Sequence, residues 1–177
     1  MRTSLLFISI MMVCGLIFSG CSSFSQESAS SGEDKKDMNY DLSRMGKEQS
    51  TNDKAFIEML KSSVATAERL IEELELELLE AQGHDELHEV KEMMNQTHQD
   101  LLYIWNKVNN DHKPDHPELK KLQAKFVYLI GQYRLGISTE LEGMETGDPA
   151  RLKEGYQTSM EARLQLQALF EDAQELW

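Results

Sequence analysis

The sequence predicts an all-α protein whose main part, residues 51–177, is an up-down-up-down four-helix bundle. From Thr51 onward, apolar residues recur at alternating steps of three and four, which is typical of amphipathic helices. Short segments that contain Gly or Pro interrupt this pattern, and short connections make consecutive helices antiparallel neighbours. Few β-branched runs occur, and no hairpin turns separate alternating segments, so strands are not expected. A long two-helix hairpin that dimerises through its apolar stripe is the alternative architecture.

The first predicted helix begins near Thr51, where Thr51, Asn52 or Asp53 can cap it, and Gly83 can end it. A run of carboxylates at 72–77 is expected on its solvated face, which leaves partner binding there open. Its apolar stripe follows the three-four alternation throughout: Ile57, Leu60, Val64, Ala67, Ile71, Leu74, Leu78 and Ala81.

The second helix is expected over about residues 85–109, and the segment that ends in Pro114 breaks it. Its stripe is Leu87, Val90, Met94, Thr97, Leu101, Ile104 and Val108. The third helix should begin at Pro117, a residue favoured at the first helical position, with Asp115 or His116 as the cap. Its stripe is Leu119, Leu122, Phe126, Leu129, Tyr133, Ile137, Leu141 and Met144.

The fourth helix should be capped by Asp148 and opened by Pro149, directly after Gly147. Its predicted stripe is Leu152, Tyr156, Leu166, Phe170, Ala173 and Trp177, with Met160, Leu164 and Leu169 beside it. The helices should each span roughly 25 to 30 residues, or about 40 Å at 1.5 Å per residue.

Glycines within the third and fourth helices need a reason, because each costs about 1 kcal/mol relative to alanine. They are Gly131, Gly136, Gly143 and Gly155. We expect close helix packing at these positions. A kink, or a concave pocket lined by tyrosines, is the alternative; the candidate tyrosines are Tyr128, Tyr133 and Tyr156.

Residues 1–20 have the order of parts found in an export signal. Arg2 is the only charged residue among the first 26, and an apolar run extends from Leu5 to Phe18. The small residues Ser19 and Gly20 then precede Cys21. The apolar run is shorter than the roughly 20 residues that a membrane-spanning helix needs.

This arrangement resembles the lipobox of bacterial lipoproteins, in which a cysteine follows a small residue at the cleavage point. The resemblance covers about the first 21 residues, and Phe18 departs from it because leucine is usual there. It implies that Cys21 becomes the mature N-terminus and carries a diacylglyceryl group on its sulfur. The expected location is therefore the cell envelope, with a lipid anchor on the outer face of a bacterial membrane. An ordinary cleaved signal and an uncleaved N-terminal anchor are the alternatives.

Residues 21–50 are expected to form the lipidated cysteine and a flexible linker. Ser, Glu, Asp and Lys dominate this segment, and such a composition cannot bury enough apolar surface to order itself. A coil of this length has an r.m.s. reach of about 30 Å. The apolar residues that could dock on the helical domain are Met38, Tyr40, Leu42 and Met45.

The charge balance limits the partners. Of the 18 Lys and Arg residues, Arg2 lies in the predicted signal, which leaves 17 against 31 acidic residues, or −14. Nucleic-acid binders show a basic stripe, which this chain lacks, and an acidic body is repelled by anionic membrane surfaces. Cations, basic peptides or neutral ligands suit it better. With Cys14 in the signal and Cys21 lipidated, no disulfide or CxxC site is expected.

Two groups of histidines are candidate metal ligands. His84 and His88 lie four residues apart, but Asp85 stands where the HExxH zinc motif has glutamate. The second connection holds Asp111, His112, Asp115 and His116, whose nitrogen and oxygen atoms suit zinc, nickel or copper. A solvated helix start and helix-cap roles are the simpler interpretations. His98, beside the second stripe, is expected to be a hydrogen-bonded structural residue.

Motifs of catalysis are weak in this sequence. The serines lack a nucleophile elbow, and no glycine-rich loop suits a phosphate. We therefore expect a non-enzymatic, lipid-anchored binding or interaction module of the cell envelope, without a cofactor. Its partner would be an envelope protein or a small ligand, and a homo-oligomer is compatible with the sequence. A metal-binding or metal-delivery lipoprotein that uses the His and Asp clusters is the alternative.

Overall fold

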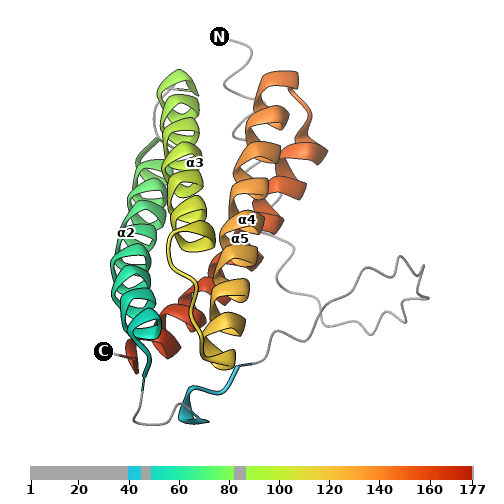
Figure 1. Ribbon diagram of the computed structural model, residues 1–177. Coiled ribbons are helices and arrows are strands. Elements are labelled where there is room, and N and C mark those ends of the chain that lie inside the picture. The colour runs from blue at the N-terminus through green and yellow to red at the C-terminus, as the bar shows by residue number, and fades with distance from the viewer. Residues whose placement is uncertain (1–39, 45–48, 82–86, 177) are drawn as a thin grey trace, which may run out of the picture. The chain divides into compact units, whose positions relative to one another are not determined.

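A computed structural model describes residues 40–44, 49–81 and 87–176 of the chain (Figure 1). These residues form a short 3₁₀ helix and four α-helices, without a β-strand among them, and so confirm the predicted all-α four-helix bundle. The elements are η1 (Leu42–Arg44), α2 (Thr51–Ala81), α3 (Leu87–Asn110), α4 (Pro117–Thr146) and α5 (Pro149–Gln174). The predicted export signal, Cys21 and the Gly83 turn lie outside the described residues.

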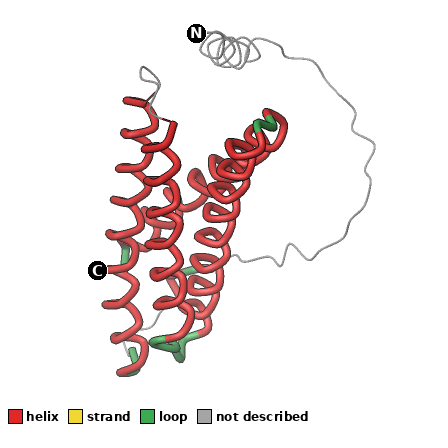
Figure 2. Tube along the Cα trace, turned by 90° about the horizontal axis from the view of Figure 1, so that it is seen from above, coloured by secondary structure: helices red, strands yellow, loops and turns green. Residues whose placement is uncertain are grey.

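Consecutive helices of the bundle pack against one another in antiparallel pairs. The contact between α4 and α5 is by far the most extensive, whereas α2 meets α5 over only a short stretch. Figure 1 shows α5 inclined to the other helices, and Figure 2 shows the short loops between the helices. The bundle thus consists of two helix pairs, α2–α3 and α4–α5, which are joined along α3 and α4.

The helix α2 begins with a reciprocal cap. The Ser50 hydroxyl accepts the backbone N–H of Asp53 at 3.0 Å, and the Asp53 carboxylate accepts the backbone N–H of Ser50 at 3.3 Å. This is a capping box, which satisfies two otherwise unpaired donors of the first turn. The cap residue is therefore Ser50, and the prediction of a cap within 51–53 was wrong, although Asp53 completes the motif.

The starts of α4 and α5 follow the predictions. His116 is the cap of α4, where its Nδ1 accepts the backbone N–H of Glu118 at 3.2 Å. Asp148 caps α5 and accepts the backbone N–H of Ala150 at 2.9 Å. Gly147 ends α4 with a φ of 68°, a left-handed conformation that glycine adopts without strain.

The core confirms the stripes predicted for α2, α3 and α4. Every member whose side chain is described is buried or half-buried, with Leu60, Leu101 and Phe126 fully enclosed. Phe56 and Met59 of α2 are buried as well, so this stripe is wider than the predicted one.

The predicted stripe of α5 was wrong in its first half. Tyr156 is 54% exposed and Leu164 is 60% exposed, whereas Leu169 lies fully in the core. The buried residues of this half are small ones, Gly155, Ser159 and Ala162. Because α5 lies so close to α4 there, only small side chains fit between them, and hydrophobicity patterns do not reveal such a face.

The internal glycines explain this close approach. A methyl group at Gly136 would lie 2.5 Å from the Ser159 nitrogen, and one at Gly155 would lie 2.5 Å from the Glu140 nitrogen. Gly143 faces the backbone of α5 in the same way. Close packing is thus confirmed for these three. It was wrong for Gly131, whose nearest neighbour, Trp105 Nε1, would lie 3.7 Å from the added methyl.

Part of the predicted linker packs on the bundle. The Tyr40 hydroxyl donates to Asp172 at 2.7 Å, and its ring lies 5.0 Å from Lys125 Nζ. The Asp41 N–H donates to Glu118 at 2.7 Å, and Leu42 packs against the core. Two of the four candidate docking residues therefore do dock, while Met38 and Met45 lie outside the described residues.

Candidate functional site: a pocket between the helix pairs

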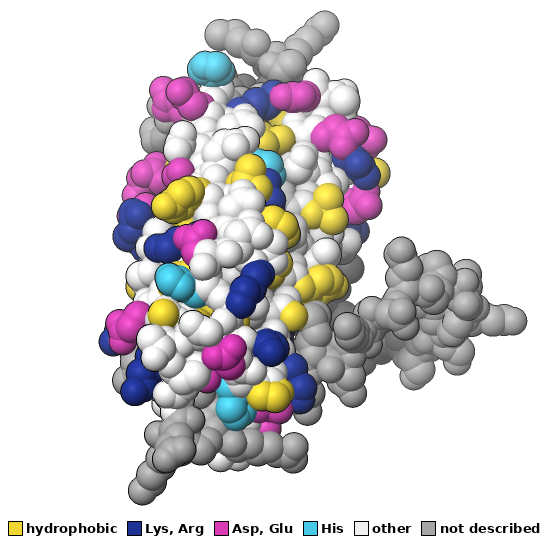
Figure 3. All heavy atoms as spheres, in the orientation of Figure 1, with side chains coloured by type: hydrophobic (Ala, Val, Ile, Leu, Met, Phe, Trp, Pro, Cys, Tyr) yellow, Lys and Arg dark blue, Asp and Glu magenta, His cyan; other side chains and the backbone are white. Residues whose placement is uncertain are grey.

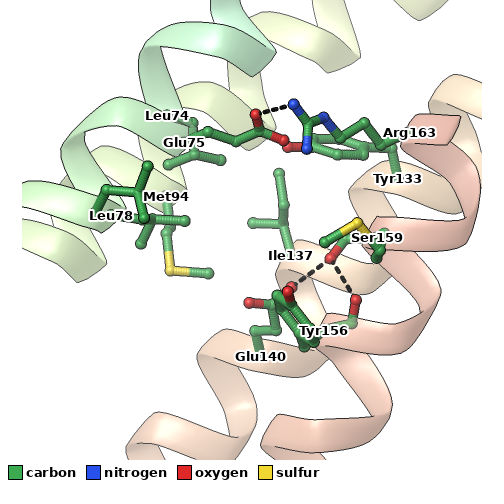
Figure 4. Close-up of a pocket in the computed structure, with 12 residues that line it drawn as sticks. Leu74, Glu75, Leu78, Met94, Tyr133, Ile137, Glu140, Tyr156, Ser159 and Arg163 are labelled. Atoms are coloured by element: carbon green, nitrogen blue, oxygen red, sulfur yellow. Dashed lines mark hydrogen bonds and ion pairs between the residues drawn. The ribbon is translucent and has the colours of Figure 1, made fainter. Parts of the chain in front are cut away.

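A pocket with a volume of about 210 Å³ lies between α2 and the α4–α5 pair (Figure 4). Its apolar lining comes from all four helices: Leu74, Leu78, Leu79, Met94, Ile137 and Met160. Its polar lining comes from α2, α4 and α5: Glu75, Tyr133, Glu140, Tyr156, Ser159 and Arg163. An apolar space with a few polar groups is the usual composition of a small-ligand site.

The pocket has a simple structural origin. The small residues Gly136, Gly155 and Ser159 draw α5 tightly onto α4. The contact between α2 and α5 is much less extensive than that between α4 and α5. Space therefore remains between the C-terminal half of α2 and the N-terminal half of α5.

An ion pair links the two sides of this space. The Glu75 carboxylate of α2 is paired with the Arg163 guanidinium of α5 (Figure 4). Burial raises the pKa of Glu75, an effect that Arg163 partly offsets and that nearby Glu72 reinforces. The two charges of the pair neutralise one another at the edge of the pocket.

Glu140 is the most deeply placed acid of the pocket. Glu140 is only 8% exposed, and its Oε1 accepts a hydrogen bond from the Ser159 hydroxyl at 2.7 Å. The described ion pairs do not include Glu140. Burial raises the pKa of Glu140, and the hydrogen bond from Ser159 offsets this only in part. The carboxylate form is therefore poorly compensated in the free protein.

The phenol of Tyr133 lies beside these acids. Tyr133 is 4% exposed, and Figure 4 shows its ring next to the Glu75–Arg163 pair. Burial, together with the charges of Glu75 and Glu140, raises the pKa of Tyr133. The group consequently remains a neutral phenol at physiological pH and offers an O–H donor.

The pocket matches part of the expectation from sequence. Tyr133 and Tyr156 line it, but Tyr128, which is 47% exposed, does not. No sequence pattern pointed to Glu140 or Arg163, and Glu75, expected on the solvated face of the first helix within the run 72–77, is instead half-buried and lines the pocket. The only available signal was an acidic residue, Glu140, at a position that the helical period places next to Ile137 and Leu141.

The burial of the Glu140 carboxyl group leads to a prediction about the stability of the protein. A group with a raised folded-state pKa favours folding below its unfolded-state pKa and loses that contribution as pH rises through the folded-state pKa. Glu140→Gln, which keeps an acceptor for Ser159, should therefore stabilise the protein by on the order of 1 kcal/mol at pH 7. The gain should vanish near pH 4, which urea unfolding at both pH values would measure.

The matched control for this prediction is Glu145→Gln, an exposed position of the same helix with the same charge change. It should alter the free energy of unfolding by less than about 0.5 kcal/mol at either pH. An equal loss of stability in both variants at pH 7 would contradict the interpretation of Glu140.

Two of the four candidate metal ligands in the second connection, Asp115 and His116, make hydrogen bonds within the fold. His116 caps α4, and Asp115 accepts the Ser50 hydroxyl at 2.7 Å and the Asn52 amide at 3.1 Å. Asp111 and His112 are exposed. At the other end, His88 is exposed, and His84 lies outside the described residues. No group of three or more His, Cys, Asp or Glu residues suited to a metal ion occurs in the described part of the chain.

His98 has the structural role expected for it. Arg134 Nε donates to the His98 carbonyl oxygen at 3.1 Å, and Arg134 Nη2 lies 3.2 Å from His98 Nε2. Burial lowers the pKa of His98, and the Arg134 charge lowers it further. The imidazole is therefore the neutral partner of a hydrogen bond between α3 and α4.

The surface of the bundle is mixed in character. On the face shown in Figure 3, acidic, basic and hydrophobic side chains are interspersed along the helices. None of the helices that the structure describes combines the length and the hydrophobicity that a bilayer crossing requires.

Comparison of the chain with protein-family models, with curated proteins and with solved structures gives no match in any of the three.

Proposed function

We propose that this protein is a lipid-anchored, non-enzymatic binding module of the bacterial cell envelope. The Phe18-Ser19-Gly20-Cys21 sequence after an apolar run supports the anchor. A thioether to a diacylglyceryl group requires a thiol, and Cys21 supplies it. Two or more acyl chains on one residue give stable membrane attachment, because each buried methylene contributes about 0.8 kcal/mol.

The pocket between α2 and α5 is the observation on which the binding role depends. It is an open space of about 210 Å³ with apolar walls. The carboxyl group of Glu140, a residue that is only 8% exposed, also lines it. A poorly compensated buried charge reduces stability, so its presence favours a functional role over a structural one. The lipid would hold the bundle at the membrane, where the pocket meets ligands outside the cell.

The anchor is tested by changing the two cysteines separately. The unchanged protein should fractionate with membranes, and mass spectrometry should find its N-terminal peptide starting at residue 21 with acyl groups on sulfur. Cys21→Ser should abolish this acylated form, because serine cannot form the thioether. Cys14→Ser, within the predicted signal, is the control and should leave the acylated form unchanged. A native chain that starts elsewhere, with an unmodified Cys21, would refute the proposal.

A further inference from the structure

We infer that the pocket between α2 and α5 binds a small organic cation, an ammonium group on a compact apolar body, with the ammonium placed at the Glu140 carboxylate. This inference rests on the proposed binding role and names the chemistry of its ligand.

The size of the pocket sets the size of the ligand. Its volume of about 210 Å³ exceeds the roughly 150 Å³ of an engineered cavity that holds benzene. It is smaller than the roughly 300–1,000 Å³ of pockets for drug-sized molecules. A single ring or a short branched chain with one polar group therefore fits, and Leu74, Leu78 and Ile137 supply apolar walls for it.

The charges of the pocket set the sign of the ligand. Glu75 and Arg163 neutralise one another, while Glu140 has a serine hydroxyl as its hydrogen-bond partner and takes part in none of the described ion pairs. An anionic ligand would be repelled by the Glu140 carboxylate. A neutral ligand would leave the buried Glu140 carboxylate without a partner of opposite charge, which is costly. An ammonium group instead supplies the missing charge and donates hydrogen bonds to the carboxylate.

The aromatic residues of the pocket favour the same ligand. Tyr133 and Tyr156 both line it (Figure 4), and the faces of aromatic rings attract cations. The acidic balance of the chain, −13 over all residues, also draws cations toward the surface.

A series of three matched probes tests the inference by calorimetric titration of the purified full chain in a non-ionic detergent. The probes are 2-phenylethylammonium, the neutral 2-phenylethanol and the anionic phenylacetate. The ammonium should bind saturably with a dissociation constant on the order of 1 mM or tighter, as expected for about nine non-hydrogen atoms. The alcohol should bind at least roughly tenfold more weakly, and the anion should not bind.

Two variants locate the binding site. Glu140→Gln should weaken ammonium binding by roughly tenfold or more, because a charge-assisted hydrogen bond is lost. Glu145→Gln makes the same change of charge on the exposed side of α4 and should leave the affinity within about twofold. Equal losses in both variants would show that the ammonium responds only to the overall charge, and would overturn the inference.

The pH dependence of binding to the unchanged protein provides a further test. Ammonium binding should weaken as pH falls through the pKa of Glu140, since the ligand requires its carboxylate form. The other titratable or charged groups that face Glu140 across the pocket are Glu75 of α2, Tyr133 of α4, and Tyr156 and Arg163 of α5. Among these, Glu75 is the other carboxyl group, so the pH profile is repeated with Glu75→Gln, which should retain the weakening.

The result separates this inference from the proposed anchor. Absence of saturable ammonium binding at millimolar concentration, or equal affinity for the alcohol, would refute the cation site. The acylated N-terminal peptide would still be found in that case. An unmodified Cys21 would refute the anchor, whereas the probe titrations would remain informative about the pocket.

Discussion

Gly136→Ala should destabilise the bundle by about 2–3 kcal/mol, although alanine is the better helix former. The added methyl would lie 2.5 Å from the Ser159 nitrogen, and the next neighbours, Ser159 Cβ and Cα, are at 2.7 and 2.8 Å. The nearest of these atoms belongs to backbone, so a change of rotamer cannot relieve the overlap. The helices α4 and α5 must separate, and the buried contacts of Ala162 and Leu166 would loosen with them. Urea unfolding followed by circular dichroism would measure the loss.

Gly131→Ala is the matched control in the same helix. Its methyl would meet Trp105 Nε1 at 3.7 Å, an ordinary contact. The substitution should therefore stabilise the protein by up to about 1 kcal/mol, through the helix propensity of alanine and the reduced entropy of the unfolded chain. Similar effects at the two glycines would mean that α4 and α5 are not in the close contact described above.

Asp53→Ala should cost about 3 kcal/mol, because Asp53 joins two distant segments. Asp53 is 4% exposed, and its Oδ1 accepts hydrogen bonds from the backbone N–H groups of Asp115 and His116 at 2.8 and 2.9 Å. Alanine would leave these donors unpaired at the start of α4 and would also remove half of the capping box with Ser50. Thermal or urea unfolding measures the loss, and the exposed Asp111→Ala, in the same connection, should have little effect.

The contribution of Asp53 to stability should also depend on pH. Burial raises the pKa of Asp53, but the hydrogen bonds from His116, Ser50 and Asp115 together outweigh this effect and hold the pKa below the ordinary aspartate value. A lowered folded-state pKa contributes stability above the unfolded-state pKa and loses it as pH falls. The advantage of the unchanged protein over Asp53→Asn should thus shrink below pH 3.8. An advantage that stays constant down to pH 2 would contradict this assignment.

Two of the buried acids, Asp53 and Glu140, affect stability differently because their surroundings differ. Asp53 receives several hydrogen bonds and stabilises the fold in its charged form. Glu140 receives one from Ser159, and its charged form is disfavoured. Asp53 has a structural role, because its hydrogen bonds connect α2 with the start of α4. Glu140 has no comparable structural role, which is why we associate it with a ligand.

The sequence by itself determined the elements of this fold. The stripes of α2, α3 and α4 and the caps at His116 and Asp148 follow from the periodicity of apolar residues and from local hydrogen bonding. These signals are local, since each depends on residues within one or two helical turns. The proposed lipobox is likewise inferred from a linear pattern, the residues around Cys21.

Only the tertiary structure decided which face of α5 is buried and where the pocket lies. The face that includes Gly155 and Ser159 is small rather than apolar, so its burial depends on the shape of α4 opposite it. The pocket results from the inclination of α5 and combines side chains that lie far apart in the chain, such as Glu75 and Arg163. Such a space depends on how whole helices pack, and a pattern read along one helix at a time carries no information about the gap that remains between two of them.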